Sequence, residues 1–144
     1  MRSKFLTLLV ILVALTAVMM LSGCDNNRDN RLEAALSSEV EVQYIGTGDT
    51  TFRFEVLDLY DNVSVWYVST DEETVGDALL ALDLISGEYG AFGLFVSEVN
   101  GISADSVSDS AWWSFSIDGE FAMTGVDTTT IEQGRTYAFV LTES

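Results

Sequence analysis

An apolar run near the N-terminus most constrains what this 144-residue chain can fold into. Arg2 and Lys4 give a short positive start, and residues 5–21 are apolar apart from two threonines. This order is typical of an export signal, which is removed from the mature protein. We therefore expect the folded part to lie within residues 24–144, a length that suits one compact domain with a tether.

The run ends in Leu21-Ser22-Gly23-Cys24, which has the form of a lipobox. In such a motif the apolar first residue docks in the lipoprotein peptidase, and the small residues let the backbone enter its active site. The Cys24 thiol carries the lipid, whose acyl chains, such as palmitate, insert into the membrane. The motif predicts a lipoprotein signal peptide over residues 1–23 and a protein held at the extracytoplasmic face of the cell membrane. The alternative is an uncleaved transmembrane helix, because about 17–25 apolar residues span a bilayer.

Composition excludes several classes of function. The chain has no histidine, and its one cysteine is the predicted lipidation site, so Ser/His or Cys/His nucleophiles and zinc ligation by His or Cys are excluded. We expect no enzyme, no catalytic residue, no metal and no cofactor. The mature region keeps four basic and 23 acidic residues, a net charge of −19. Such a surface repels the phosphates of nucleic acid, so nucleic acid is an unsuitable partner.

Residues 24–39 are predicted to be the lipidated cysteine followed by a flexible tether, because residues 25–39 are mostly polar and charged. A flexible segment of that length reaches about 20 Å, at roughly 5–6 Å times the square root of its length. An apolar trio, Leu32, Ala35 and Leu36, could equally form one short helical turn.

From residue 40 onward, apolar side chains recur at every second position, as in half-buried strands. Residues 40–44 and 52–56 show this alternation, and residues 46–49 between them have the composition of a hairpin turn. Residues 61–62 predict another turn, and residues 63–68 predict a further strand that is rich in β-branched and aromatic side chains.

One helix is predicted after these strands. Thr74 is a suitable N-cap with Asp77 three residues on, and apolar residues at 75, 78, 79 and 82 form one face. Gly87 is the expected stop. Strands are then expected at 94–99, 112–117, 120–123 and 137–141, with loops at 90–93 and 103–110 and tight turns at Asn100-Gly101 and Asp118-Gly119. The sum is an α+β domain over residues 40–144, a mixed sheet with one main helix packed on one face.

The hairpin at residues 112–123 carries the candidate ligand or partner face. A two-residue turn at Asp118-Gly119 pairs Ile117 with Glu120, Ser116 with Phe121 and Ser114 with Met123. One face then carries Trp113, Phe115, Ile117 and Ala122, which we expect under the helix. The other, partly open face carries Trp112, Ser114, Ser116, Phe121 and Met123. The alternative is that the loop at 103–110, or the chain near Tyr89, covers this face as a minor core. A one-residue slip would exchange the two faces.

An ordered set of short motifs resembles the transcobalamin-like C-terminal domain, a domain of unknown function (DUF4430) that occurs in bacterial lipoproteins. The motifs are Thr74–Leu79, Tyr89–Gly93, Val99–Ile102, Trp112–Glu120, Thr124–Val126 and Gly134–Val140. The resemblance covers about residues 50–143 and implies a β-grasp-like fold. In the vertebrate carriers this domain closes over a corrinoid that also rests on a large helical barrel. The barrel is absent from this chain, and without histidine any corrinoid contact would be through stacking and hydrogen bonds.

The resemblance and the predicted lipid on Cys24 together imply a membrane-anchored binding module. It would capture a cobalamin-like compound for a transporter, with Tyr89 and Phe92 joining the face of the 112–123 hairpin. The alternative is an adaptor that docks another surface protein and has no small-molecule ligand.

Overall fold

The computed structural model describes residues 27–37 and 39–144, so the predicted signal peptide, Cys24 and the apolar run lie outside the described residues. Within the described part of the chain, no helix is both long and apolar enough to cross a membrane. The main sheet contains β1 (Val42–Gly46), β2 (Thr50–Leu57), β3 (Val63–Thr70), β7 (Ala111–Ile117), β8 (Glu120–Phe121) and β9 (Thr136–Glu143). A smaller sheet contains β4 (Ile85–Gly90), β5 (Gly93–Val99) and β6 (Ile102–Ser103). The helices are α2 (Asn27–Leu36), α3 (Val75–Ala81), α4 (Ala104–Val107) and the 3₁₀ turn η1 (Val126–Thr128).

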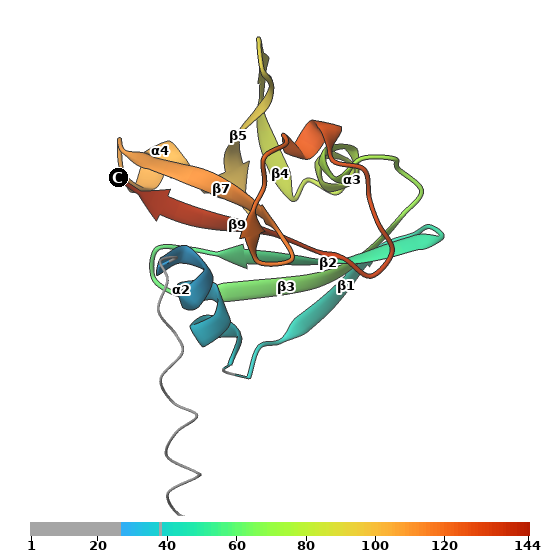
Figure 1. Ribbon diagram of the computed structural model, residues 1–144, viewed down its shortest axis with the longest axis horizontal. Coiled ribbons are helices and arrows are strands. Elements are labelled where there is room, and N and C mark those ends of the chain that lie inside the picture. Colours follow the sequence, from blue (N-terminus) through green and yellow to red (C-terminus); the bar gives the residue numbers. More distant parts are fainter. Residues whose placement is uncertain (1–26, 38) are drawn as a thin grey trace, which may run out of the picture.

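The main sheet has the strand order β1-β3-β2-β9-β7-β8. Two pairs, β1 with β3 and β2 with β9, are parallel, and the other neighbours are antiparallel. With α3 on one face, this mixed sheet confirms the predicted α+β class (Figure 1).

The predicted hairpin between residues 40–44 and 52–56 is wrong, because β1 pairs with β3 and not with β2. The chain between β1 and β2 instead passes close to the end of β3. A Cβ on Gly48 would lie 2.0 Å from the carbonyl carbon of Thr70, and the Asp49 N–H donates to the Asp71 carboxylate at 2.8 Å. Gly46 and Gly48 have φ of 80° and 156°, which lets the chain make this close crossing.

The core lies between the inner face of the main sheet, α3 and the small sheet. Phe52 and Phe54 from β2 are fully buried there, as is Leu141 from β9, while Tyr137 and Phe139 are almost fully buried. Residues 137, 139 and 141 therefore face inward, and the predicted strand at 137–141 is confirmed.

The start of α3 is as predicted, because the Asp77 N–H donates to the Thr74 hydroxyl at 3.2 Å. Its predicted end at Gly87 is wrong. Asp83 takes a left-handed conformation with φ of 55°, and the N–H groups of Asp83 and Leu84 donate to the carbonyls of Leu80 and Leu79. This is a Schellman stop made by an aspartate. Gly87 lies in β4, where a Cβ would meet the Phe95 carbonyl at 2.0 Å.

The segment predicted as a flexible tether is instead largely the helix α2, docked on the outer face of the main sheet (Figure 1). Leu32 is buried against Leu57, Ala138 and Val140. The apolar trio noted in the sequence does lie in a helix, as the alternative interpretation expected, and it forms the packing face of that helix. Similarly, the predicted loop at 103–110 contains the short helix α4.

Candidate ligand-binding surfaces

The β4–β5 hairpin projects from the body of the domain (Figure 1). It carries exposed aromatic side chains. We call Tyr89, Phe92 and Phe95 the hairpin tip. Their exposed fractions are 66%, 102% and 69%, so each ring offers most of its surface to solvent. The predicted loop at 90–93 is the connection of this hairpin, with Gly93 at φ of 101°.

The hairpin packs on the core of the domain, and this packing fixes the direction in which the tip projects. Leu94 and Val96 contact the core, and Tyr89 pairs with Leu94 on the same face. Phe95 pairs with Glu88 on the opposite face, because successive side chains of a strand alternate. The aromatic rings of the tip therefore lie on both faces of the hairpin.

The β7–β8 hairpin has the predicted register. Asp118 and Gly119 have φ of 50° and 83°, as a type I′ turn requires, and Ser116 pairs with Phe121. The predicted Ser114–Met123 pair lies beyond the ladder, because β8 ends at Phe121. On the inner face, Trp113 and Phe115 are buried, and Ile117 and Ala122 are partly buried against the core, as expected.

The predicted open face of this hairpin is only partly open. Phe121 and Met123 are 53% and 91% exposed, but Ser114 and Ser116 are buried and Trp112 is half-buried. The serine hydroxyls expected to meet a ligand therefore do not reach solvent.

The structure also divides the predicted site residues between two sides of the sheet. Ser114 pairs with Val140 and Ser116 with Phe121, so these residues share the face that α2 covers. Tyr89 and Phe92 belong to a hairpin whose base packs on the opposite, inner face. Trp112 and Phe121 therefore do not form one site with the hairpin tip.

Asp127 is a feature of the site region that sequence reasoning missed. One of its carboxylate oxygens, Oδ1, is buried without a hydrogen-bond partner among the described residues. The carboxylate lies between Gly93 and Gly125, where added Cβ atoms would come within 2.8 Å and 2.6 Å of its oxygens. Asp127 of η1 is thus packed closely against Gly93 at the start of β5. No motif or periodicity marks it, because the contact links segments more than 30 residues apart.

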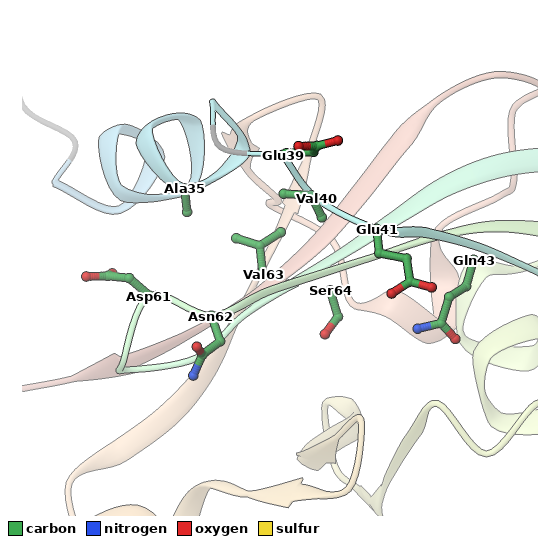
Figure 2. A pocket seen from close by; sticks show the side chains of 9 residues that line it. All are labelled: Ala35, Glu39, Val40, Glu41, Gln43, Asp61, Asn62, Val63 and Ser64. Atoms are coloured by element: carbon green, nitrogen blue, oxygen red, sulfur yellow. The ribbon is translucent and has the colours of Figure 1, made fainter.

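A cavity of about 400 Å³ lies away from the hairpin tip, between α2 and the start of β1 (Figure 2). Its lining residues are Ala35, Glu39, Val40, Glu41, Gln43, Asp61, Asn62, Val63 and Ser64. The lining is acidic, and Asp61 is already paired with Arg31 at 2.9 Å. Two smaller cavities, of about 280 and 290 Å³, lie beside α2 and beside α3. None of the three is lined by the hairpin tip, and the described residues contain no cluster of three or more His, Cys, Asp or Glu able to hold a metal ion.

Comparison with known proteins finds a family match and several similar solved structures. Residues 72–142 match the family described as Domain of unknown function (DUF4430). A structure from Ruminococcus gnavus ATCC 29149, described as a metal-binding candidate, is 27% identical with a TM-score of 0.63, covering 67% of this chain and 99% of its own. Haptocorrin in complex with Cbi is 15% identical with a TM-score of 0.53, covering 69% of this chain, which spans only 26% of haptocorrin. The likeness to haptocorrin concerns the fold alone. The curated proteins contain no match.

Proposed function

We propose that the chain, whose residues 72–142 match the DUF4430 family, is a lipid-anchored module that binds a flat, largely apolar ligand through its hairpin tip. A corrinoid is the leading candidate for that ligand. The lipid on Cys24 would hold the module at the extracytoplasmic face of the cell membrane, where it captures the ligand for a transporter.

We also assign the domain a β-grasp-like fold. Four strands support it, because β3-β2-β9-β7 are adjacent in the main sheet, with a parallel central pair and antiparallel flanks. The helix α3 lies between the first and second strand pairs in sequence and packs on the inner face of the sheet.

The exposed hairpin tip is the observation that carries the proposed binding function. Phe92 is fully exposed, and Tyr89 and Phe95 are about two-thirds exposed, on a chain with a large negative charge. The three exposed rings lie close together along the chain at one projecting tip, with Tyr89 and Phe95 on its two faces. Exposed apolar groups that gather in one place mark interaction sites more often than scattered ones do. Their faces stack on flat ligands, and the Tyr89 hydroxyl can add a hydrogen bond.

Two observations favour a corrinoid within the class of flat ligands. The fold is similar to that of haptocorrin, whose structure contains Cbi. The motifs of residues 50–143 resemble the transcobalamin-like domain. Since this chain spans about a quarter of haptocorrin, it would cover one side of such a ligand and leave the other for a transporter component.

Titration of the mature chain with cobinamide and cobalamin tests the ligand. We expect saturable binding, measured by equilibrium dialysis, that Phe92→Ala weakens about tenfold, as loss of a stacking contact of about 1.4 kcal/mol predicts. Phe121→Ala is the matched control, because Phe121 is also an exposed phenylalanine but lies on the opposite face. No binding at tens of micromolar, or equal losses in both variants, would contradict the proposal.

An adaptor function is the second candidate. The hairpin tip projects outward and none of the three cavities described above adjoins it, which suits insertion into a pocket of another surface protein. Under this proposal, Phe92→Ala loses a partner that co-purifies with the wild-type chain, while neither protein binds a corrinoid.

The lipid anchor has its own test. Cys24→Ser is expected to abolish cleavage after residue 23 and the mass increase of the lipid. Mass spectrometry of the membrane fraction measures both. An unchanged mass and cleavage pattern in the variant would exclude the anchor.

A further inference from the structure

We propose that the α2-covered face of the main sheet is the membrane-facing surface of the domain, lying against the lipid headgroups while the hairpin tip points away from the bilayer. This inference rests on the proposed lipid at Cys24. It adds an orientation, which decides what the hairpin tip can reach.

The length of chain between the lipid and the domain is the first support. Cys24 precedes the start of α2 at Asn27 by three residues, which span at most about 10 Å when fully extended. A flexible tether to residue 39 would reach about 20 Å and leave the orientation free. Because α2 is packed on the domain, the lipid is confined to the α2 side.

Apolar packing and hydrogen bonds hold α2 against the main sheet. Leu32 is buried against the outer face, and the Arg31 guanidinium donates to the Asp61 carboxylate and to the Asp58 carbonyl, each at 2.9 Å. Asp58 in turn accepts the N–H groups of Tyr60 and Asn62 at 2.8 and 2.9 Å. The helix is therefore hydrogen-bonded to the turn between β2 and β3, and Asp58 stabilises that turn.

Aromatic side chains suited to a bilayer interface lie on this side. Tyr44 is 81% exposed and shares the α2-covered face, because it pairs with Tyr67, which pairs with Arg53. Tyr60, in the turn fastened to α2, is 80% exposed, and Phe121 adds a partly exposed ring. Tyrosine is enriched at membrane–water interfaces, where its ring is apolar and its hydroxyl stays wet.

The few basic residues of the mature chain also favour this side. Arg28 and Arg31 lie in α2, and Arg53 lies on the α2-covered face. Burial alone would lower the pKa of Arg53, but the hydrogen bond to Glu55 and the neighbouring Tyr67 raise it, so the guanidinium stays charged. The β4–β5 hairpin, residues 85–99, has no basic residue. The hairpin therefore offers no arginine to the phosphate groups of zwitterionic lipids, whereas the α2 side does.

The hairpin tip lies on the other side of the main sheet from α2 (Figure 1). With α2 against the bilayer, Phe92 is directed into the aqueous compartment. The tip then meets ligands or partners from solution and does not insert into lipid.

Site-specific fluorescence in vesicles tests this orientation. Lipidated Cys24 leaves no other thiol in the chain, so Tyr60→Cys or Phe92→Cys gives a single labelling site. Each labelled, lipidated protein is reconstituted into phosphatidylcholine vesicles containing a headgroup-attached quencher. We expect at least a twofold loss of fluorescence at residue 60 and no loss at residue 92.

Two matched variants test whether docking of α2 sets the orientation. Leu32→Asp places a charge in the buried contact, and Ala34→Asp places the same charge on the exposed side of the helix. Quenching at residue 60 should fall to the level of residue 92 in the first and stay unchanged in the second. Arg31→Ala buries no charge, so it tests the same contact even if Leu32→Asp disturbs the fold. It should lower the quenching at residue 60 in part.

The outcomes separate this inference from the proposed function. Equal quenching at both positions, stronger quenching at residue 92, or quenching at residue 60 that survives Leu32→Asp would overturn the orientation while leaving ligand binding untouched. A free Cys24 thiol on the purified protein would refute the anchor and, with it, the orientation.

Discussion

At the scale of single residues, Gly93 links the exposed tip to the body. Its φ of 101° disfavours any side chain, and a Cβ there would lie 2.8 Å from an Asp127 carboxylate oxygen. The sequence shows a glycine on each side of Ala91-Phe92 and does not distinguish them. The fold distinguishes the two glycines, because a Cβ on Gly90 would meet nothing within 4 Å, whereas one on Gly93 would meet Asp127.

We therefore expect Gly93→Ala to destabilise the domain by about 1–3 kcal/mol, the cost of a strained backbone conformation and a displaced carboxylate. Urea unfolding measures the change. Gly90→Ala is the matched control and should change the free energy of unfolding by less than about 1 kcal/mol. Equal effects in the two variants would contradict the close packing of Asp127 against Gly93.

At the scale of elements, Tyr137 ties the segment before β9 to the core. Its hydroxyl accepts the Glu132 N–H at 3.0 Å and donates to the Thr130 carbonyl at 3.3 Å. The alternation of β9 predicts that this ring faces inward, but nothing in the sequence predicts the partners of its hydroxyl. Those partners exist because the chain from η1 folds back over the end of the strand.

Tyr137→Phe is expected to cost about 1–2 kcal/mol at pH 7, because it leaves the Glu132 N–H without its acceptor. Burial raises the pKa of Tyr137 above its ordinary value of 10.0. The neutral ring is thus favoured in the folded state, and its contribution to stability is complete below about pH 10 and is lost as the pH rises through the folded pKa. Urea midpoints at pH 7 and at about pH 10.5 should show the wild type and the variant converging. A constant gap would count against the burial effect.

Elements also show where local signals mislead. The N-cap at Thr74 follows from nearby residues, but the helix stops at Asp83, a residue type less common than glycine in that conformation. The polar composition of α2 predicted a flexible tether, and only its apolar trio indicated a helical turn. The helix is stable because Leu32 packs on β9 and not because of intrinsic propensity.

At the scale of the whole molecule, the strong negative charge acts against compactness. The few ion pairs, such as Arg31 with Asp61 and Arg135 with Asp118, are largely exposed and contribute little each. Repulsion among the remaining carboxylates therefore dominates the electrostatics.

Stability should rise with ionic strength as a result. Raising sodium chloride from 0.01 to 0.15 M shortens the screening length from about 30 Å to about 8 Å, which weakens the repulsion. The urea midpoint should increase over this range, whereas that of a control protein with near-zero net charge should change little. A falling midpoint would mean that the ion pairs outweigh the repulsion.

The sequence by itself determined the local structure: period-two strands, the start of α3, and the type I′ turns at Asn100-Gly101 and Asp118-Gly119. Each depends on steric limits and hydrogen bonds within a few residues. Only the tertiary structure decided that β1 joins β3, that α2 docks, and that Phe92 and Phe121 lie on opposite sides of the sheet. Those outcomes depend on which distant surfaces bury each other's apolar area. Hydrophobic packing is not directional and leaves no spacing in the sequence from which the partners could be identified.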